Sequence, residues 1–171
     1  MIITRQWAMP NHNTFSIKPI KELISKYLQE GQWLDPFSRN SPFADLCCTN
    51  DLNPEFSSDY NLESLEFLKL FDTASIDGVL FDPPYSPRQI SECYKSIGRE
   101  VHMTDTQSSF YGDRKKEVSR VVKEGGIVVS FGWNSQGIGK TRGFEIIEIM
   151  LVAHGGAHND TICTVERKVK T

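Results

Sequence analysis

A short apolar run that stops at an aspartate and two prolines does most to constrain how this sequence can fold. Residues 76–81 (Ile-Asp-Gly-Val-Leu-Phe) have the length and composition of a buried strand, and Asp82-Pro83-Pro84-Tyr85 follows at once. Proline lacks the backbone N–H that strand pairing requires, so the chain must leave the sheet at this point. Asp82 is therefore predicted to lie at the carboxyl end of a buried strand.

Helical and extended patterns alternate along the rest of the chain. Helical patterns cover residues 19–30, 62–71, 88–97 and 117–123. Further strands are predicted over residues 33–34, 44–49, 127–131, 144–153 and 161–167. A glycine-rich turn joins the last two runs, which predicts an antiparallel pair. The order of elements indicates one α/β domain over residues 1–171, with a mostly parallel sheet and an antiparallel C-terminal hairpin.

Three carboxylates fall at predicted strand ends. Asp35 follows the run 33–34, Asp51 follows the run 44–49, and Asp82 follows the run 76–81. The carboxyl ends of parallel strands meet at one edge of a sheet, and open α/β sheets bind their ligands beyond that edge. The sequence therefore predicts a ligand site that contains all three carboxylates.

The charge is unevenly distributed along the chain, whose formal net charge is −3. Residues 1–82 contain 6 Lys and Arg against 12 Asp and Glu, whereas residues 83–171 contain 13 against 10. A local basic patch on an acidic body is typical of phosphate-binding surfaces, although a solvated helix face is an equal alternative. The residues expected to contact a nucleic-acid substrate are Arg88, Arg114, Lys115 and Lys116.

Other features of the sequence indicate a substrate-binding loop, a cellular location and the absence of a metal site. Residues 98–116 have no periodicity and are predicted to form a long, mobile, substrate-binding loop. No apolar stretch approaches the roughly 20 residues that cross a membrane, and no signal-peptide pattern is present, so a cytoplasmic location is expected. The four cysteines include no Cys-x-x-Cys pair, so we expect neither a metal site nor a disulfide.

Asp82-Pro83-Pro84-Tyr85 has the composition needed to activate an aromatic exocyclic amine. The lone pair of such an amine is delocalised into its ring, which makes the nitrogen a poor nucleophile. A carboxylate and a backbone carbonyl that accept its two hydrogens would favour a pyramidal nitrogen with an available lone pair. The prolines present that carbonyl rigidly, and the Tyr85 ring offers a stacking surface for a base, worth ~1–3 kcal/mol. The alternative is a purely structural role for these four residues, as a rigid turn with a buried aromatic side chain.

The tetrapeptide resembles the catalytic signature of the DNA amino-methyltransferases, which methylate adenine N6 or cytosine N4. The resemblance implies a Rossmann-like class I S-adenosylmethionine-dependent methyltransferase fold, with Asp82, Pro83, Pro84 and Tyr85 as catalytic residues. It extends over nearly the whole chain in the family's order. Positions that match cofactor-binding segments of the family are Phe15, Ser16, Lys18, Asp35, Pro36, Phe37, Asp51, Asn61 and Glu63, together with Asp82. Trp133, which follows the strand 127–131, would line the target-base pocket, with simple packing as the alternative.

Two departures from the family pattern affect the expected function. The family's first loop continues as Asp-Pro-Phe-x-Gly-x-Gly, whereas this chain has Arg39 and Ser41 in place of the glycines. Glycine permits a close backbone approach that these residues do not, and Arg39 would instead reach the carboxylate of the cofactor. Nothing after Thr171 could form a separate target-recognition domain. Short or relaxed target specificity is therefore expected, unless a second copy or a partner subunit supplies the missing surface.

The resemblance implies an enzyme that transfers a methyl group from S-adenosylmethionine to adenine N6 in DNA, without a metal. Cytosine N4 is the closest alternative, although those enzymes commonly have serine before Pro-Pro-Tyr. An RNA substrate is a further alternative. An alternative from a different functional class is a catalytically inactive protein of the same fold that binds nucleic acid or a partner. The missing glycines of the cofactor loop are the reason to consider it.

Overall fold

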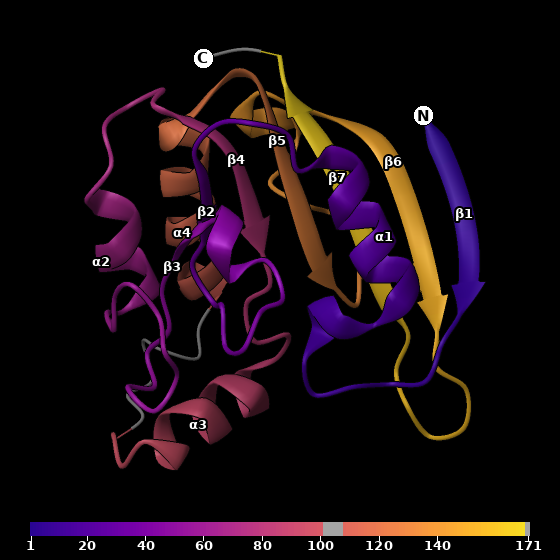
Figure 1. Cartoon of the computed structure of the whole chain (residues 1–171), viewed down its shortest axis with the longest axis horizontal. Helices are drawn as coiled ribbons and strands as arrows, with labels where there is room; N and C mark the ends of the chain where they lie inside the picture. Colours follow the sequence, from indigo (N-terminus) through magenta and orange to yellow (C-terminus); the bar gives the residue numbers. More distant parts are fainter. Residues whose placement is uncertain (101–107, 170–171) are drawn as a thin grey trace.

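The computed structural model describes residues 1–100 and 108–169, and in this part of the chain seven strands form one sheet (Figure 1). The strand order is β1-β6-β7-β5-β4-β2-β3. β7 runs antiparallel to both of its neighbours, and every other pair of neighbours is parallel. The strands are β1 (Ile2–Trp7), β2 (Trp33–Asp35), β3 (Cys48–Thr49), β4 (Ile76–Phe81), β5 (Val122–Gly132), β6 (Phe144–Ala153) and β7 (Thr161–Lys168).

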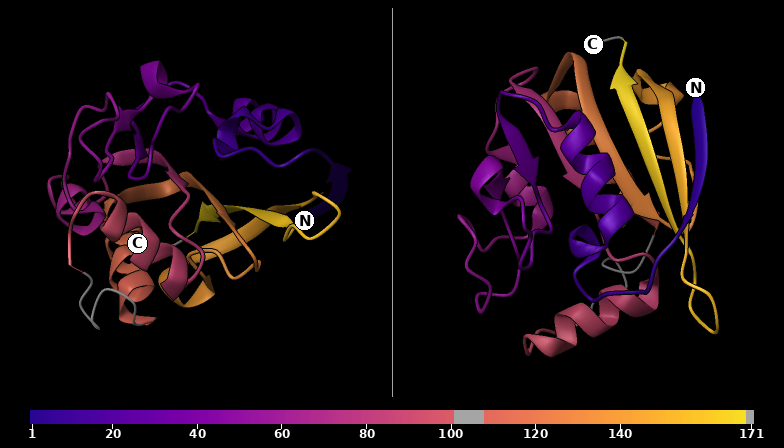
Figure 2. Two further views of the ribbon diagram at one scale, coloured as in Figure 1. Left: turned by 90° about the horizontal axis from the view of Figure 1, so that it is seen from below. Right: turned by 45° about the vertical axis from the view of Figure 1, so that its right-hand side comes forward.

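Helices cover both faces of the sheet and its carboxyl edge (Figures 1 and 2). The α-helices are α1 (Lys18–Tyr27), α2 (Ser64–Lys69), α3 (Pro87–Ser96) and α4 (Ser108–Val121), and short 3-10 turns cover Thr14–Ser16, Ala44–Leu46 and Lys140–Arg142. α1 lies on one face, and α2 and α4 lie on the other. α3 lies beyond the ends of the central strands, next to the ligand site that the sequence predicts. No helix in the described ranges is long and apolar enough to cross a membrane.

Two hydrophobic cores hold these layers together. Under α1, Ile20 and Ile24 pack against buried residues of the central strands, including Val129. On the opposite face, Phe67 of α2 and Val118 of α4 pack against the other side of the same strands. Alternate residues of the strands therefore serve different cores. This explains why the consecutive residues Val79, Leu80 and Phe81 of β4 are all apolar rather than alternating with polar ones.

The predicted architecture is confirmed in its main features, and three local predictions are wrong. β4 and β6 have the predicted bounds, and the antiparallel β6–β7 pair is present. β1 was not predicted, because this edge strand is mostly exposed and its apolar residues do not alternate. In the run 44–49, only Cys48–Thr49 is extended. In the predicted mobile loop 98–116, the stretch from Ser108 onward is helix α4, and residues 101–107 lie outside the described residues.

Candidate active site

The carboxyl ends of β2, β3 and β4 border an open cavity of about 670 Å³, and α3 lines its outer side. Of the residues that the sequence analysis expected at the cofactor, those that line the cavity are Pro36, Phe37, Arg39, Asp51, Glu63 and Asp82. Residues Asn11–Thr14 also line it, a contribution that the sequence pattern did not reveal. The predicted ligand site at the carboxyl edge of the sheet therefore exists as a cavity.

Several residues expected at the cofactor do not line this cavity. Phe15 is buried in the core, where its ring packs 5.0 Å from that of Phe131. Ser16 and Lys18 are exposed at the start of α1. The Asn61 side chain donates hydrogen bonds to the Asp51 carbonyl and to Ser58 Oγ, both at 3.0 Å, so it supports the loop below the cavity. The wall here belongs to the segment immediately before Phe15.

The three carboxylates at the strand ends lie close together, as predicted. Asp35 is completely buried at the end of β2, and neither of its oxygens meets hydrogen-bond geometry with a described partner. Burial raises the pKa of Asp35 well above its ordinary value, the charge of Asp82 raises this pKa further, and the Phe37 N–H opposes the shift only in part. Burial also raises the pKa of Asp82, against a hydrogen bond from Tyr85 and the charge of Arg39. Asp35 does not line the cavity, so the prediction of a ligand site with all three carboxylates is confirmed for Asp51 and Asp82 and is wrong for Asp35, which lies in the protein beneath the site.

The Asp-Pro-Pro-Tyr segment is held by contacts from three directions. The Tyr85 hydroxyl donates to Asp82 Oδ1 at 2.6 Å, and the Tyr85 ring meets the Trp133 ring edge-on, with centroids 5.8 Å apart. The Tyr111 hydroxyl of α4 donates to the Pro84 carbonyl at 2.6 Å. Ser86 then caps α3, since its Oγ accepts the N–H of Gln89. Trp133, which the sequence analysis expected to line a target-base pocket, thus lies against Tyr85, whereas Tyr111 was missed because its helix was predicted as a loop.

Arg39 occupies the position of the family's first glycine and adopts the backbone conformation that glycine favours. Its φ is +44°, in the left-handed region that other residues rarely enter. Two hydrogen bonds hold it there: its N–H donates to Asp51 Oδ2 at 2.9 Å, and its guanidinium donates to the His12 carbonyl at 3.0 Å. The loop after β2 therefore adopts its turn without the two glycines, and Arg39 links this loop to the N-terminal segment that lines the cavity.

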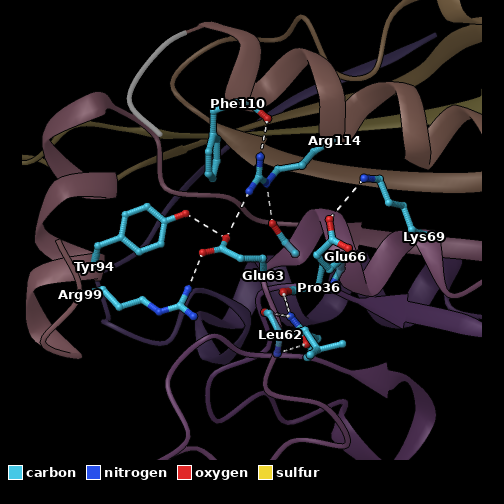
Figure 3. A network of polar contacts seen from close by, with 11 residues as sticks. Pro36, Leu62, Glu63, Glu66, Lys69, Tyr94, Arg99, Phe110 and Arg114 are labelled. Carbon is cyan, nitrogen blue, oxygen red and sulfur yellow. Dashed lines mark hydrogen bonds and ion pairs between the residues drawn. The ribbon is translucent and has the colours of Figure 1, made fainter. Parts of the chain in front are cut away.

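A polar network around Glu63 forms the wall beside α3 and α4 (Figure 3). Glu63 accepts hydrogen bonds from the Tyr94 hydroxyl at 2.9 Å and from the Arg99 guanidinium at 2.8 Å. Arg114 reaches the same carboxylate at 3.4 Å. The network joins the loop before α2 to both helices that follow the Asp-Pro-Pro-Tyr segment, so it fixes α3 over the cavity.

The predicted substrate contact at Arg114 is wrong for this structure. Arg114 is only 6% exposed. Its Nε donates a hydrogen bond to Ser64 Oγ at 2.6 Å, and its Nη1 donates one to the Phe110 carbonyl at 3.1 Å. The guanidinium also lies 3.5 Å from the centroid of the Phe110 ring. Arg114 is thus engaged inside the protein rather than displayed to phosphate.

The other basic residues do not form one surface with it. Lys115 is half-buried and Lys116 is exposed, because successive residues of an α-helix point about 100° apart. Arg88 is exposed on α3 and forms an i,i+4 ion pair with Glu92 at 2.9 Å. The expected basic cluster is therefore divided among separate environments, and Lys116 remains the member of the triplet that faces solvent.

A second, smaller cavity of about 70 Å³ lies on the α4 side of the Asp-Pro-Pro-Tyr segment. Its walls include Tyr85, Tyr111 and Trp133, with Lys115 and Ser130 contributing polar groups. Pro83 and Tyr85 line both cavities, so the segment separates them. Ser130 gave no signal in the sequence, because a serine inside an apolar strand does not show which face of the sheet it occupies.

No protein-family model and no curated protein matches the sequence. Solved structures do share its architecture. A Burkholderia thailandensis 1,6-didemethyltoxoflavin-N1-methyltransferase, solved with 1,6-didemethyltoxoflavin and S-adenosylhomocysteine, is 12% identical with a TM-score of 0.59 over 88% of this chain and 76% of that one. A Methanosarcina mazei S-adenosylmethionine-dependent methyltransferase is 14% identical with a TM-score of 0.56, over 87% and 98%. TrmN from Thermus thermophilus is 14% identical with a TM-score of 0.60, over 90% and 49%.

These similarities confirm the predicted class I S-adenosylmethionine-dependent methyltransferase fold. The mostly parallel seven-stranded sheet with its antiparallel β6–β7 pair agrees with that assignment.

Proposed function

We propose that this protein is an S-adenosylmethionine-dependent methyltransferase that modifies the N6 amino group of adenine in DNA. The observation that carries the proposal is the position of Asp82-Pro83-Pro84-Tyr85, at the end of a central strand and in the partition between two cavities. A methyl donor in the larger cavity and an amine entering from the smaller one would meet at this segment. The resemblance of the tetrapeptide to the signature of the amino-methyltransferases favours a nucleobase amine.

The residues of the larger cavity fit the proposed methyl donor. The volume of about 670 Å³ is typical of a small-molecule site. Asp51, at the end of β3, suits the ribose hydroxyls as a hydrogen-bond acceptor. The guanidinium of Arg39 suits the carboxylate of the methionine part, since such pairs form strong charge-assisted hydrogen bonds. When bound, S-adenosylmethionine would supply an electrophilic methyl group, and its sulfur would take up the bonding electrons.

The chain's own residues would orient the amine and remove its proton. The Asp82 carboxylate and the Pro83 carbonyl would accept hydrogen bonds from the amino group, which favours a pyramidal nitrogen. Preorganised acceptors in a site that excludes water act more strongly than they would in solvent. Because burial raises the pKa of Asp82, its carboxylate is also a better acceptor for the proton that the nitrogen loses. The hydrogen bond from Tyr111 to the Pro84 carbonyl keeps the segment in place.

DNA is proposed as the substrate on the strength of the family resemblance. Lys116 on α4 and basic residues on α3 would meet its backbone, and a second copy or a partner subunit would extend the surface that recognises sequence. Methylation of DNA duplexes and, in parallel, of RNA with tritiated cofactor, followed by digestion to nucleosides and mass spectrometry, identifies the product directly. Label in N6-methyl-2′-deoxyadenosine supports the proposal, label in a methylated deoxycytidine contradicts the choice of base, and label in RNA alone contradicts DNA.

The role of Asp82 is tested by Asp82→Ala in single-turnover methylation. Loss of the acceptor should slow methyl transfer by on the order of 100-fold or more, as for other groups that act chiefly in the transition state. Asp45→Ala is a matched control, because Asp45 is exposed outside both cavities. Calorimetric titration with S-adenosylhomocysteine should show binding in all three proteins. Transfer by Asp82→Ala at the wild-type rate would overturn the mechanism, and absence of binding in the wild type would overturn the cofactor.

A further inference from the structure

The smaller cavity has the flat aromatic walls and buried polar floor of a recognition site. The Tyr85 and Trp133 rings meet at 74° along one side, and Tyr111 lies on the α4 side. Trp133 is 41% exposed, so it stands where the cavity meets solvent. At about 70 Å³ the cavity is smaller than a whole base, which would therefore enter it by one edge. Planar walls of this kind suit the edge and face of an aromatic heterocycle.

Two polar groups of this cavity lack partners within the described part of the chain. Ser130 Oγ is buried on β5 and has no hydrogen-bond partner. Lys115 is half-buried on α4, and its ammonium makes no hydrogen bond or ion pair with any described residue. Buried polar groups are nearly always hydrogen-bonded in folded proteins. An unpartnered buried hydroxyl beside a half-buried ammonium, both on one small cavity, therefore indicates a ligand that supplies acceptors.

The charges around Lys115 do not remove its need for a partner. Glu166 is an acidic group whose charge acts on Lys115, but its carboxylate already accepts the backbone N–H groups of Ile138 and Gly139, at 2.7 and 2.9 Å. Arg142 is a second positive charge nearby. Burial and the charge of Arg142 lower the pKa of Lys115, and the charge of Glu166 opposes them. The ammonium is therefore partly desolvated and incompletely compensated, and a good acceptor in the cavity would stabilise it.

We propose that Lys115 and Ser130 form a base-reading site, with Lys115 donating a hydrogen bond to a ring nitrogen that flanks the amino group of the target base. This inference rests on the proposed function and names the contact that selects the base edge. Adenine has acceptor nitrogens, N1 and N7, on the two sides of its amino group. Asp82 and Pro83 would accept hydrogen bonds from the amino group, and Lys115 would donate one to the ring nitrogen on the same edge of the base. Together these contacts would select a base edge that has an acceptor next to its amino group over an edge that has none.

This role differs from the one that the sequence indicated for Lys115. A phosphate contact requires an exposed ammonium, and Lys116, the next residue on α4, meets that requirement. Lys115 instead faces the partition that holds Tyr85 and Pro83. The two neighbouring lysines therefore make a matched pair for a test: one is expected to affect the choice of base edge, and the other the general attraction to DNA.

The test compares wild type, Lys115→Met and Lys116→Met on three DNA substrates. One contains adenine, and the others have every adenine replaced by 7-deazaadenine or by 1-deazaadenine, which lack one ring acceptor each. Wild type should lose about 5- to 100-fold in kcat/KM on one of the two analogues, the usual range for one base-edge hydrogen bond. Lys115→Met should lose a similar factor on adenine and no longer distinguish adenine from that analogue. Lys116→Met should keep the wild-type discrimination.

The outcomes separate this inference from the proposed function. If wild type methylates none of the DNAs, the proposed function fails and this inference fails with it. If wild type is active and Lys115→Met keeps the wild-type ratio between adenine and both analogues, only the base-reading role is overturned. Titration with S-adenosylhomocysteine checks that each variant is folded and binds at wild-type affinity. Ser130→Ala, which removes the other unpartnered donor without adding volume, provides the same comparison if Lys115→Met does not fold.

Discussion

Replacing Arg114 with methionine tests whether this residue stabilises the fold as a buried ion or binds the phosphate groups of DNA. The guanidinium contacts Glu63, Ser64 and the Phe110 carbonyl, and its side chain is 8% exposed. Removing one member of a buried ion pair generally costs ~3–5 kcal/mol, because the partner is left uncompensated. Glu63 is 30% exposed and keeps Tyr94 and Arg99, which reduces the expected loss to about 2–3 kcal/mol. For a chain of 171 residues this corresponds to a decrease in Tm of roughly 4–12 °C.

Differential scanning calorimetry, with circular dichroism as a second probe, measures this change. Lys116→Met is the control, since Lys116 is exposed on the same helix and its replacement should change stability by less than about 0.5 kcal/mol. DNA binding over a range of salt concentrations gives an independent readout. An unchanged Tm in Arg114→Met, together with a log–log salt slope shallower by about 0.9, would refute the structural role and restore the phosphate contact.

Three further predictions concern the larger cavity. Tyr85→Phe removes a hydrogen bond that lowers the pKa of Asp82, so the acid limb of the pH–rate profile, where activity falls as Asp82 is protonated, should move to higher pH; an unmoved limb would show that Asp82 does not control it. Arg39→Gly should change unfolding free energy by less than about 1 kcal/mol, because relief of the positive φ offsets the lost hydrogen bond to His12, yet calorimetry should show about 10-fold weaker S-adenosylmethionine binding. Equal or tighter binding would restrict Arg39 to a structural role. Asp51→Ala should weaken cofactor binding by ~1.5–3 kcal/mol, and unchanged affinity would contradict its proposed contact with the ribose.

The sequence alone determined the architecture and the edge of the sheet where the site lies. The run 76–81 is mostly apolar and is followed by Asp82 and two prolines, so its type and its end follow from local chemistry. The antiparallel hairpin was equally clear, because a glycine-rich turn separates two long apolar runs. Placement of Asp35, Asp51 and Asp82 at one edge then followed from the parallel arrangement of strands. These features depend on residues close together in the chain.

Only the tertiary structure decided which side chains face a cavity. Arg39 was a departure from the glycine pattern in sequence, and contacts with Asp51 and His12, from other segments, hold its positive φ. Arg114, Lys115 and Lys116 are three consecutive basic residues with no local feature to separate them. Once they lie on a helix packed against the sheet, the rotation of about 100° per residue directs them to different environments. One is then buried beside Glu63, the next lines the smaller cavity, and the third faces solvent, because burial depends on neighbours that are distant in sequence.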